Sequence, residues 1–367
     1  MYLGLMSGTS LDGLDMCLVD FHTSGSFNIN CFCCIDYPKE IKNKLHIACD
    51  TSNNDVNFLQ SFNIELAKFH ADAVNKFLKD NNLAPADIKA IGSIGQTIRH
   101  EPNIDFNFSY QIIEPNTLAV STGINVIADF RQKDIACGGQ GAPLSPVFHK
   151  YILDSLNLKD EHLFIVNIGG IANLSYLHKD KLIGFDCSTG NLLLNTWCRK
   201  HLDVDYDKDG NFAAQGSVNH KLLDSMFSDP FFAESYPKST GRDLFNMQWL
   251  ESHLAKVDPV APADVQATLV ALTARGIISE ITNLADRGKV YICGGGAYNL
   301  FLYKTLVAGL SGFEVDTTAA LGVAPDQVEA AMIGWLSYMY ENNYQIDLRG
   351  VTGSNKICKL GVKYNFD

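Results

Sequence analysis

The amino-acid sequence predicts an α/β protein built from two duplicated domains that face each other across a cleft. Residues 1–20 read as an apolar strand, a polar turn rich in glycine and hydroxyl groups, and a returning strand. Residues 163–177 repeat this order at the start of the second half. A third apolar strand, residues 290–293, ends in three consecutive glycines before a helix. Strands that alternate with helical segments are typical of an α/β fold, and the repeated hairpin indicates the duplication.

Length and composition limit the class of protein further. A chain of 367 residues is too long for one small core, so we expect two domains, residues 1–130, joined by part of the C-terminal segment, and residues 131–367. The net charge of −12 argues against a nucleic-acid partner. The sequence has no apolar run of about 18 residues and no secretory signal. We therefore expect no membrane partner and a cytoplasmic location, where the ten scattered cysteines stay free thiols.

The first hairpin turns through residues 7–13, with Asp12 and Gly13 at or near its tip, where a positive φ costs little. A turn dense in glycine and hydroxyl residues exposes backbone N–H groups, which bind anions and phosphate above all. Asp12 and Asp15 would repel a phosphate unless Mg²⁺ lay between them. An ordinary polar turn explains the same residues equally well, and from these residues alone both interpretations stay open.

Two further strands of the first half end in polar clusters. Residues 90–95 lead into Gln96 and Thr97, and residues 125–128 lead into a cluster that contains Arg131. Polar residues directly after an apolar strand occupy the place where α/β sheets bind ligands, although a solvated loop is as good an explanation. The guanidinium of Arg131 suits a carboxylate. The glycine-rich residues 138–141 that follow suit an interdomain crossing or a moving loop.

The second half adds Asp186, which a short strand at residues 182–185 delivers into a polar loop. The next helix starts with Asn191 near its cap. Gly294 to Gly296, placed between a strand and a helix, would cradle a nucleotide, because glycines allow close backbone approach and the helix dipole favours anions. Tight packing is the alternative explanation for these glycines. Residues 326–339 read as an amphipathic helix that carries Glu329.

Several common sites are excluded by the sequence. It has no Walker A motif, no nucleophile elbow and no protein-kinase signature, and no dinucleotide fingerprint after the first strand. The aspartate-rich residues 203–210 resemble a calcium loop, but Gly216 stands where a glutamate is required, so we expect a structural or substrate loop. Zinc is excluded at Cys31 and Cys34, because a strand over residues 27–35 points them to opposite faces.

Taken together, these features resemble the superfamily of sugar kinases, actin and heat-shock chaperone ATPases, and most closely the anhydro-N-acetylmuramic acid kinase family. The resemblance covers nearly the whole chain as a series of ordered blocks. One block departs from the family's usual FDTGPGN, because Cys187, Ser188 and Thr189 replace Thr-Gly-Pro, and the path of this loop stays open. The blocks are GLMSGTSLDGLD (residues 4–15), GQTIRH (95–100), DFRQKDIACGGQGAPL (129–144), NIGGIANLS (167–175), GFDCSTGN (184–191), YDKDG (206–210), PKSTGRDLFN (237–246) and CGGGAYN (293–299).

The resemblance implies a two-domain actin-like ATPase fold of the ribonuclease H-like type. It also implies a kinase that uses ATP and Mg²⁺ to convert 1,6-anhydro-N-acetylmuramic acid and water to N-acetylmuramic acid 6-phosphate and ADP, in peptidoglycan recycling. Another sugar or acid kinase of the same fold, or a non-catalytic ATP-binding switch, are the alternatives. The expected partners are the sugar and ATP, with a homodimer left open.

On the positions that match the family, the resemblance assigns four groups of residues. Asp186 is the base that activates water, and Asp12 holds Mg²⁺ through water. The sugar and its lactyl carboxylate are assigned to Gln96, Thr97, Arg131, Asp134 and Glu329. The ATP-binding residues are Gly8, Thr9, Ser10, Leu11, Asp12, Gly13, Leu14, Asp15, Gly169, Gly170, Gly294, Gly295, Gly296 and Asn299.

Overall fold

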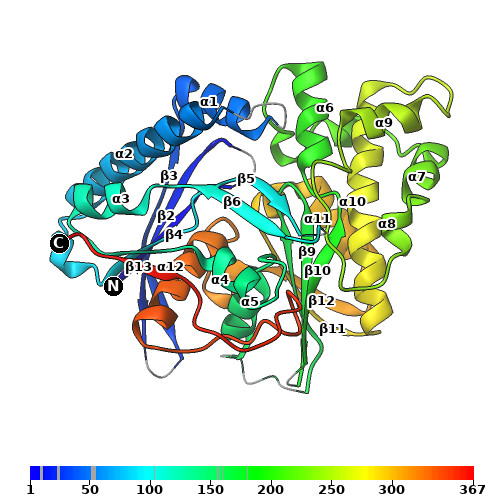
Figure 1. Cartoon of the computed structure of the whole chain (residues 1–367). Helices are drawn as coiled ribbons and strands as arrows, with labels where there is room; N and C mark the ends of the chain where they lie inside the picture. The colour runs from blue at the N-terminus through cyan, green and yellow to red at the C-terminus, as the bar shows by residue number, and fades with distance from the viewer. Residues whose placement is uncertain are drawn as a thin grey trace. The chain divides into compact units, whose positions relative to one another are not determined.

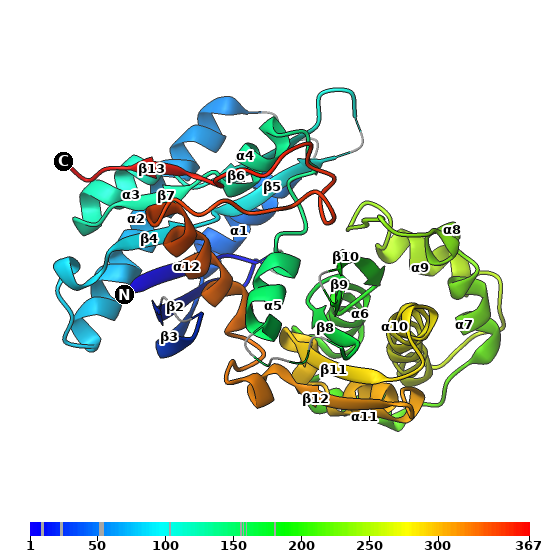
Figure 2. The same cartoon turned by 90° about the horizontal axis from the view of Figure 1, so that it is seen from below.

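The structure is a computed structural model that describes residues 1–8, 11–22, 25–50, 55–102, 104–154, 156, 158, 160–179 and 181–367. The chain divides into two compact units (Figures 1 and 2). Unit 1 consists of residues 1–151 and 327–367, and unit 2 consists of residues 152–326. No helix in the described part of the chain is long and apolar enough to cross a membrane.

The boundary between the units differs from the one expected between residues 130 and 131. It falls inside helix α5 (Ser145–Asp154). The reason is that the loop before α5 is bonded to the end of the chain: the Gln140 N–H donates to the Thr352 carbonyl (3.0 Å), and the Asn355 N–H donates to the Cys137 carbonyl (2.8 Å). These bonds attach residues 130–151 to unit 1.

Unit 1 contains a six-stranded sheet in the order β13-β7-β4-β1-β2-β3. The first three strands in sequence, β1, β2 and β3, are antiparallel neighbours, whereas β4 and β7 run parallel to β1. The last strand, β13, joins antiparallel to β7. The strands are β1 (Tyr2–Met6), β2 (Gly13–Phe21), β3 (Phe27–Asp36), β4 (Ala90–Ser93), β7 (Val126–Ala128) and β13 (Val362–Tyr364).

Helices cover both faces of this sheet, because successive strand residues point to opposite sides. Leu3 and Leu5 of β1 pack into a core with helix α2 (Val56–Asp80). Gly4 points to the other face, where a Cβ atom would lie 1.9 Å from the Ala330 carbonyl oxygen of α12 (Val328–Glu341). Only glycine allows α12 to cross β1 this closely. Figures 1 and 2 show α2 and α12 on opposite sides of the sheet.

The remaining elements of unit 1 are short. Strands β5 and β6 form a separate two-stranded antiparallel sheet. The elements are α1 (Lys39–Cys49), β5 (Gln96–Glu101), β6 (Phe108–Ile112), α3 (Pro115–Thr122) and α4 (Phe130–Ala136).

Unit 2 repeats the sheet of unit 1. Its strand order is β10-β9-β8-β11-β12, in which the first three strands in sequence are antiparallel neighbours and the last two run parallel to the first. The same order and directions therefore occur twice in the chain, and the predicted duplication is confirmed. The strands are β8 (Leu163–Ile168), β9 (Ala172–His178), β10 (Lys181–Ser188), β11 (Gly288–Cys293) and β12 (Phe313–Thr317).

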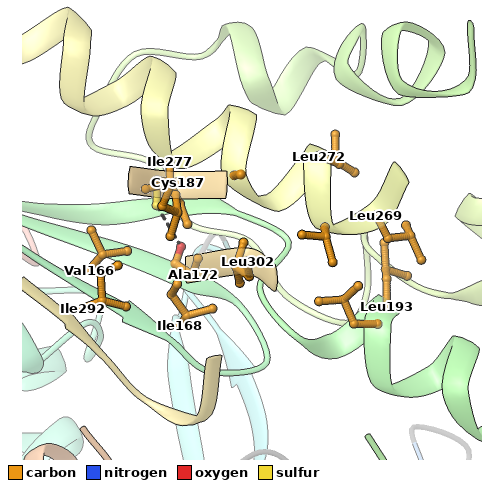
Figure 3. Close-up of a cluster of buried hydrophobic side chains, with 14 of the residues drawn as sticks. Val166, Ile168, Ala172, Cys187, Leu193, Leu269, Leu272, Ile277, Ile292 and Leu302 are labelled. Carbon is orange, nitrogen blue, oxygen red and sulfur yellow. Dashed lines mark hydrogen bonds between the residues drawn. The ribbon is translucent and has the colours of Figure 1, made fainter. Parts of the chain in front are cut away.

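The core of unit 2 lies between its sheet and helix α10 (Pro262–Leu284). Val166 and Ile168 of β8 pack there with Leu272 and Ile277 of α10 (Figure 3). This core fixes the carboxyl end of β8, where the glycine turn begins. The other helices of the unit are α6 (Leu192–Leu202), α7 (His220–Phe227), α8 (Pro230–Ala233), α9 (Met247–Leu254) and α11 (Leu300–Gly309).

Candidate active site

Most of the sequence-predicted site residues lie at the carboxyl ends of parallel strands, the edge at which α/β sheets bind ligands. In unit 1 they follow β1, β4 and β7. In unit 2 they follow β8 and β11, and Asp186 lies near the end of β10, which runs in the same direction. Each sheet therefore presents its polar and glycine-rich residues at one edge.

The turn between β1 and β2 contains the predicted phosphate-binding residues. Thr9 and Ser10 lie outside the described residues. Leu11 adopts a φ of 62°, and its N–H donates to the Gly8 carbonyl (3.3 Å). A Cβ atom on Gly13 would lie 2.6 Å from the Ile35 carbonyl oxygen, so the end of the turn is pressed against β3. The Tyr37 N–H donates to the Asp12 carbonyl (2.9 Å), and the Asp12 residue is exposed.

A buried chain of hydrogen bonds lies behind this turn. The Ser7 hydroxyl donates to Gln96 Oε1 (2.6 Å), and the Gln96 amide donates to the Gly8 carbonyl (3.2 Å). The Tyr37 hydroxyl donates to Ser7 Oγ (2.8 Å) and lies 2.8 Å from His70 Nε2. Complete burial lowers the pKa of His70 to about 3, which keeps its imidazole neutral. No sequence motif pointed to Tyr37 or His70.

Two residues predicted to contact the sugar are instead used within the protein. Gln96 is fully buried, and its amide group is committed to Ser7 and Gly8. Asp134 is also fully buried, and its carboxylate accepts the Gly141 N–H (2.8 Å) and the Thr352 hydroxyl (2.9 Å). Neither side chain reaches the surface in this structure, so direct contact with a sugar does not fit their placement.

The same bonds correct the expectation for residues 138–141. This glycine-rich stretch lies inside unit 1 and is not a crossing between the units. A Cβ atom on Gly139 would lie 2.2 Å from Asp134 Oδ2, and the Gly141 N–H is bonded to the same oxygen. The glycines therefore allow the loop to wrap closely around a buried carboxylate.

The other residues predicted to bind the sugar remain accessible. Thr97, Arg131 and Glu329 are each half-buried. The Thr97 hydroxyl accepts a hydrogen bond from the Gln111 amide (3.2 Å). Burial and the nearby charge of Arg131 together lower the pKa of His100 to about 4, which places a neutral imidazole beside the guanidinium. Arg131 is therefore a cationic group that acts on His100 of β5.

Three glycine-containing turns of unit 2 meet around Asn191 and the Ile168 carbonyl. Its N–H donates to the Gly169 carbonyl (2.8 Å), and its side-chain amide donates to the Ile168 carbonyl (3.1 Å). Gly294 adopts a φ of 78°, and a Cβ atom there would lie 2.8 Å from the same Ile168 carbonyl oxygen. Gly295 is exposed, and a Cβ atom on it would have no neighbour closer than 3.9 Å. This open glycine leaves backbone room for a ligand.

The aspartate-rich loop, residues 203–210, packs against Asn299 at the start of α11. A Cβ atom on Gly210 would lie 2.3 Å from Asn299 Oδ1, and that same oxygen caps α11 by accepting the Leu302 N–H (3.0 Å). The buried Asp207 carboxylate accepts the Phe212 and Ala213 N–H groups (2.8 and 3.0 Å). Its oxygens are bonded to backbone, as expected for a structural loop.

Asp186 is half-buried next to a bulge near the end of β10. Its Oδ2 accepts the Thr240 N–H (2.9 Å), and its own N–H donates to the Lys238 carbonyl (3.1 Å). The residues that depart from the family pattern follow at once, and each is bonded. The Cys187 thiol donates to the Ala172 carbonyl (3.3 Å), as Figure 3 shows, and the Ser188 hydroxyl donates to the Leu272 carbonyl (3.4 Å).

Helix α10 is shaped to receive this loop. Thr189 Oγ1 lies 3.0 Å from Thr273 Oγ1, and the Thr273 hydroxyl donates to the Gly190 carbonyl (3.1 Å). A Cβ atom on Gly276 would lie 2.5 Å from Ser188 Oγ, so the absence of a side chain there makes room for the serine. The loop that the sequence left open therefore has a defined path, fixed by hydroxyl groups.

The residues around the β1–β2 turn fit a magnesium ion. No group of three or more His, Cys, Asp or Glu side chains in the described residues could hold a metal by itself. Mg²⁺ needs only one or two carboxylates, because phosphates and water supply its other ligands. Burial is the main cause that raises the pKa of Cys34 to about 12, followed by its hydrogen bond with Asp15, and the charges of Asp15, Asp12 and Asp36 add a negative field in the same direction. The exposed Asp12 is a hard oxygen donor in that field.

Two ribonuclease H-like sheets with glycine turns at their carboxyl edges define an actin-like ATPase, the class that contains the sugar kinases. A family model described as anhydro-N-acetylmuramic acid kinase matches residues 1–366. The anhydro-N-acetylmuramic acid kinase of Shewanella denitrificans is 43% identical over 376 residues, covering 99% of this chain and 98% of that one. The protein of the same name from Shewanella pealeana is 43% identical over 368 residues, covering 100% and 99%. The chain belongs to the anhydro-N-acetylmuramic acid kinase family.

Proposed function

We propose that this protein is an ATP-dependent kinase that converts 1,6-anhydro-N-acetylmuramic acid and water to N-acetylmuramic acid 6-phosphate and ADP. The observation that carries the proposal is the match to the family over residues 1–366. The positions of Asp186 and of the glycine turns at the sheet edges support it. The role places the protein in peptidoglycan recycling and amino sugar catabolism, with a cytoplasmic location.

Asp186 acts as the general base in this proposal. Its carboxylate takes a proton from a water molecule whose oxygen bonds to the anomeric carbon. The bond from that carbon to the bridging oxygen breaks, and the released oxygen takes the γ-phosphoryl group as ADP leaves. The Thr240 N–H fixes the orientation of the carboxylate through its bond to Oδ2 (2.9 Å).

The glycine turns bind the nucleotide. In unit 1, residues 8–15 are the proposed phosphate-binding segment. In unit 2, Gly169 and Gly170 would offer backbone N–H groups to phosphate, and Gly294 to Gly296, with Asn299 at the start of α11, are the other proposed nucleotide-binding residues. Gly295 suits this role because its backbone is exposed and its surroundings are open. Asp12 would hold Mg²⁺ through water, and the ion, when bound, would neutralise charge that develops on the phosphates.

The sugar is bound by the accessible polar residues of unit 1. Arg131 pairs with the lactyl carboxylate, because its planar guanidinium matches the two oxygens of a carboxylate. Thr97 and Glu329 contact sugar hydroxyl groups. Gln96 and Asp134 act indirectly, since one holds the β1–β2 turn and the other holds residues 138–141.

Release of ADP tests the proposal. The purified protein is incubated with ATP and Mg²⁺ together with the anhydro-sugar, N-acetylmuramic acid, a plain hexose, or no sugar. We expect turnover with the anhydro-sugar and a product whose mass has gained both water and phosphate. Turnover only with another sugar would show a different sugar kinase of the same fold, and slow ADP release that no sugar accelerates would show an ATP-binding switch. Either result would overturn the proposal.

A further inference from the structure

The segment that contacts Asp186 has no regular secondary structure. Residues 234–246, between α8 and α9, form bends and turns. Two of them nevertheless bind both the backbone and the side chain of Asp186. The Lys238 carbonyl accepts the Asp186 N–H (3.1 Å), and the Thr240 N–H donates to Asp186 Oδ2 (2.9 Å). Thr240 Oγ1 is buried and has no hydrogen-bond partner in the described residues. Whatever fixes residues 238–240 therefore also fixes the orientation of the Asp186 carboxylate.

The side chain of Lys238 supplies that anchor. It is only 1% exposed, and lysine is almost never fully buried unless it is paired. Its Nζ donates to Glu280 Oε1 (2.7 Å) and to the Phe231 carbonyl (3.1 Å), and it lies 4.7 Å from the centre of the Phe231 ring. Glu280 projects from α10, the long helix at the centre of unit 2, and its side chain is 13% exposed. The ion pair thus ties residue 238 to a rigid element.

We propose that the Lys238–Glu280 ion pair is a positioning device for Asp186. It holds the backbone of residues 238–240 at the distance from which the Thr240 N–H orients the carboxylate. Stability alone is a weak reason to keep a buried ion pair, because well-packed apolar residues often replace such pairs without loss. Precise placement is a better reason, since a displacement of about 1 Å at a reacting group can cost about 100-fold in rate. The inference rests on the proposed role of Asp186 as base.

The first test is Lys238→Met, which keeps most of the side-chain volume and removes the charge. We expect kcat to fall about 10- to 100-fold, as for other groups that orient a reacting residue. The KM for the sugar and the affinity for a non-hydrolysable ATP analogue should stay at the wild-type values, because the glycine turns are untouched. Glu280→Gln, which removes only the partner charge, should give the same pattern.

The second test separates positioning from general damage. Asp186→Asn by itself should lower kcat by about 10²- to 10⁴-fold, the usual cost of losing a positioned base. Lys238→Met added to Asp186→Asn should have no further effect, because no base is left to position. If Lys238→Met lowers kcat by the same factor in both backgrounds, the pair is merely structural. If Asp186→Asn keeps wild-type kcat, the role of Asp186 as base fails, whatever Lys238 does.

A matched control lies on the same helix. Arg275 of α10 pairs with Asp224 at the same distance of 2.7 Å, but the two side chains are 43% and 69% exposed. Arg275→Met should keep the wild-type kcat. If Lys238→Met does not fold, the double variant with Lys238→Met and Glu280→Leu is measured instead. This double variant leaves no buried charge unpaired. A wild-type kcat in either folded variant would overturn the proposal.

Discussion

Single side chains differ sharply in how they contribute to this site. Arg131 and Glu329 are partly accessible, as their proposed ligand-binding role requires, whereas Gln96 and Asp134 are fully buried and bonded within the protein. Chemically similar groups at the same edge of a sheet can therefore be ligand-binding or structural. Their hydrogen-bond partners and their burial decide between the two roles.

Replacement of Arg131 tests the first role. Arg131→Lys should raise the KM for the muramic sugar, because lysine keeps the charge but cannot donate two parallel hydrogen bonds to a carboxylate. The fall in kcat/KM should correspond to a loss of about 1.5–3 kcal/mol in transition-state stabilisation, the range for a hydrogen bond to a charged group. Steady-state kinetics with the anhydro-sugar and with an analogue that lacks the lactyl group provide the measurement. An equal penalty on both sugars would make Arg131 a phosphate-binding or structural residue.

Replacement of His70 tests the buried chain behind the β1–β2 turn. Its pKa is lowered from 6.5 to about 3 in the folded protein, so below pH 6.5 the unfolded chain binds a proton that the folded chain does not. The free energy of unfolding should therefore fall as the pH drops from about 6.5 toward 3, by about 1.4 kcal/mol per pH unit for this one group.

His70→Gln keeps a polar group next to Tyr37 but does not titrate. Urea unfolding measured at several pH values below 6.5 should show a shallower loss of stability in this variant than in the wild type. His149, whose pKa burial also lowers to about 3, serves as an internal comparison, because it should maintain part of the pH dependence. An identical pH dependence in the two proteins would show that His70 is protonated in the folded state.

At the scale of elements, helix α10 and the loop after β10 fit each other through Gly276. Gly276→Ala would place a Cβ atom 2.5 Å from Ser188 Oγ and 2.9 Å from the Cys187 carbonyl oxygen. Alanine favours a helix over glycine by about 1 kcal/mol, but overpacking a core costs about 1–3 kcal/mol. We expect the overpacking to win, with a lower melting temperature and a lower kcat, measured by thermal unfolding and by ADP release.

The serine that faces Gly276 offers the control. Adding Ser188→Ala to Gly276→Ala removes the oxygen atom at 2.5 Å, so part of the lost stability should return. If Gly276→Ala alone is as stable and as active as the wild type, then the loop has room to move and its path is not set by α10.

The elements were easier to predict from the sequence than the contacts between them. Apolar runs around a polar turn predicted the hairpins β1–β2 and β8–β9, because these patterns are local. Gln96 and Asp134 were assigned to the sugar because they follow apolar strands and match the family pattern. Their actual partners, Ser7 and Thr352, lie 89 and 218 residues away in the sequence. Lys238 stood within a recognised block, but nothing in the sequence showed that this lysine is buried. Roles that depend on long-range hydrogen bonds are not visible in local patterns.

At the scale of the whole molecule, unit 1 is formed from two separate parts of the chain. The second part contributes α12, which covers Gly4 of β1 and Gly92 of β4, and β13, which extends the sheet. Unit 2 is one continuous stretch with its own sheet and core. The stability of unit 1 must therefore depend on residues 327–367, whereas the core of unit 2 does not contain them.

Truncation after residue 326 tests this dependence. We expect the backbone amides of β1 and β4 to lose their protection from hydrogen exchange, because the face covered by α12 becomes exposed to water. The amides of β8 and β11 should keep their protection, since their core lies within residues 152–326. Hydrogen exchange read by mass spectrometry reports both sets of strands in one experiment. Protected β1 amides in the truncated chain would show that α12 is dispensable for unit 1.

The split of unit 1 also has a consequence for co-translational folding. On the ribosome, residues 152–326 emerge as one piece that already contains all the strands of their sheet in the described chain, so this piece can fold as soon as it is free. Strand β1 must wait for α12, which is synthesised after all of unit 2. At a usual rate of ~5–20 residues per second, the roughly 320 residues between them leave the face of β1 that α12 covers exposed for about 16–65 seconds. The sheet whose strands are made first is therefore completed after the sheet of unit 2.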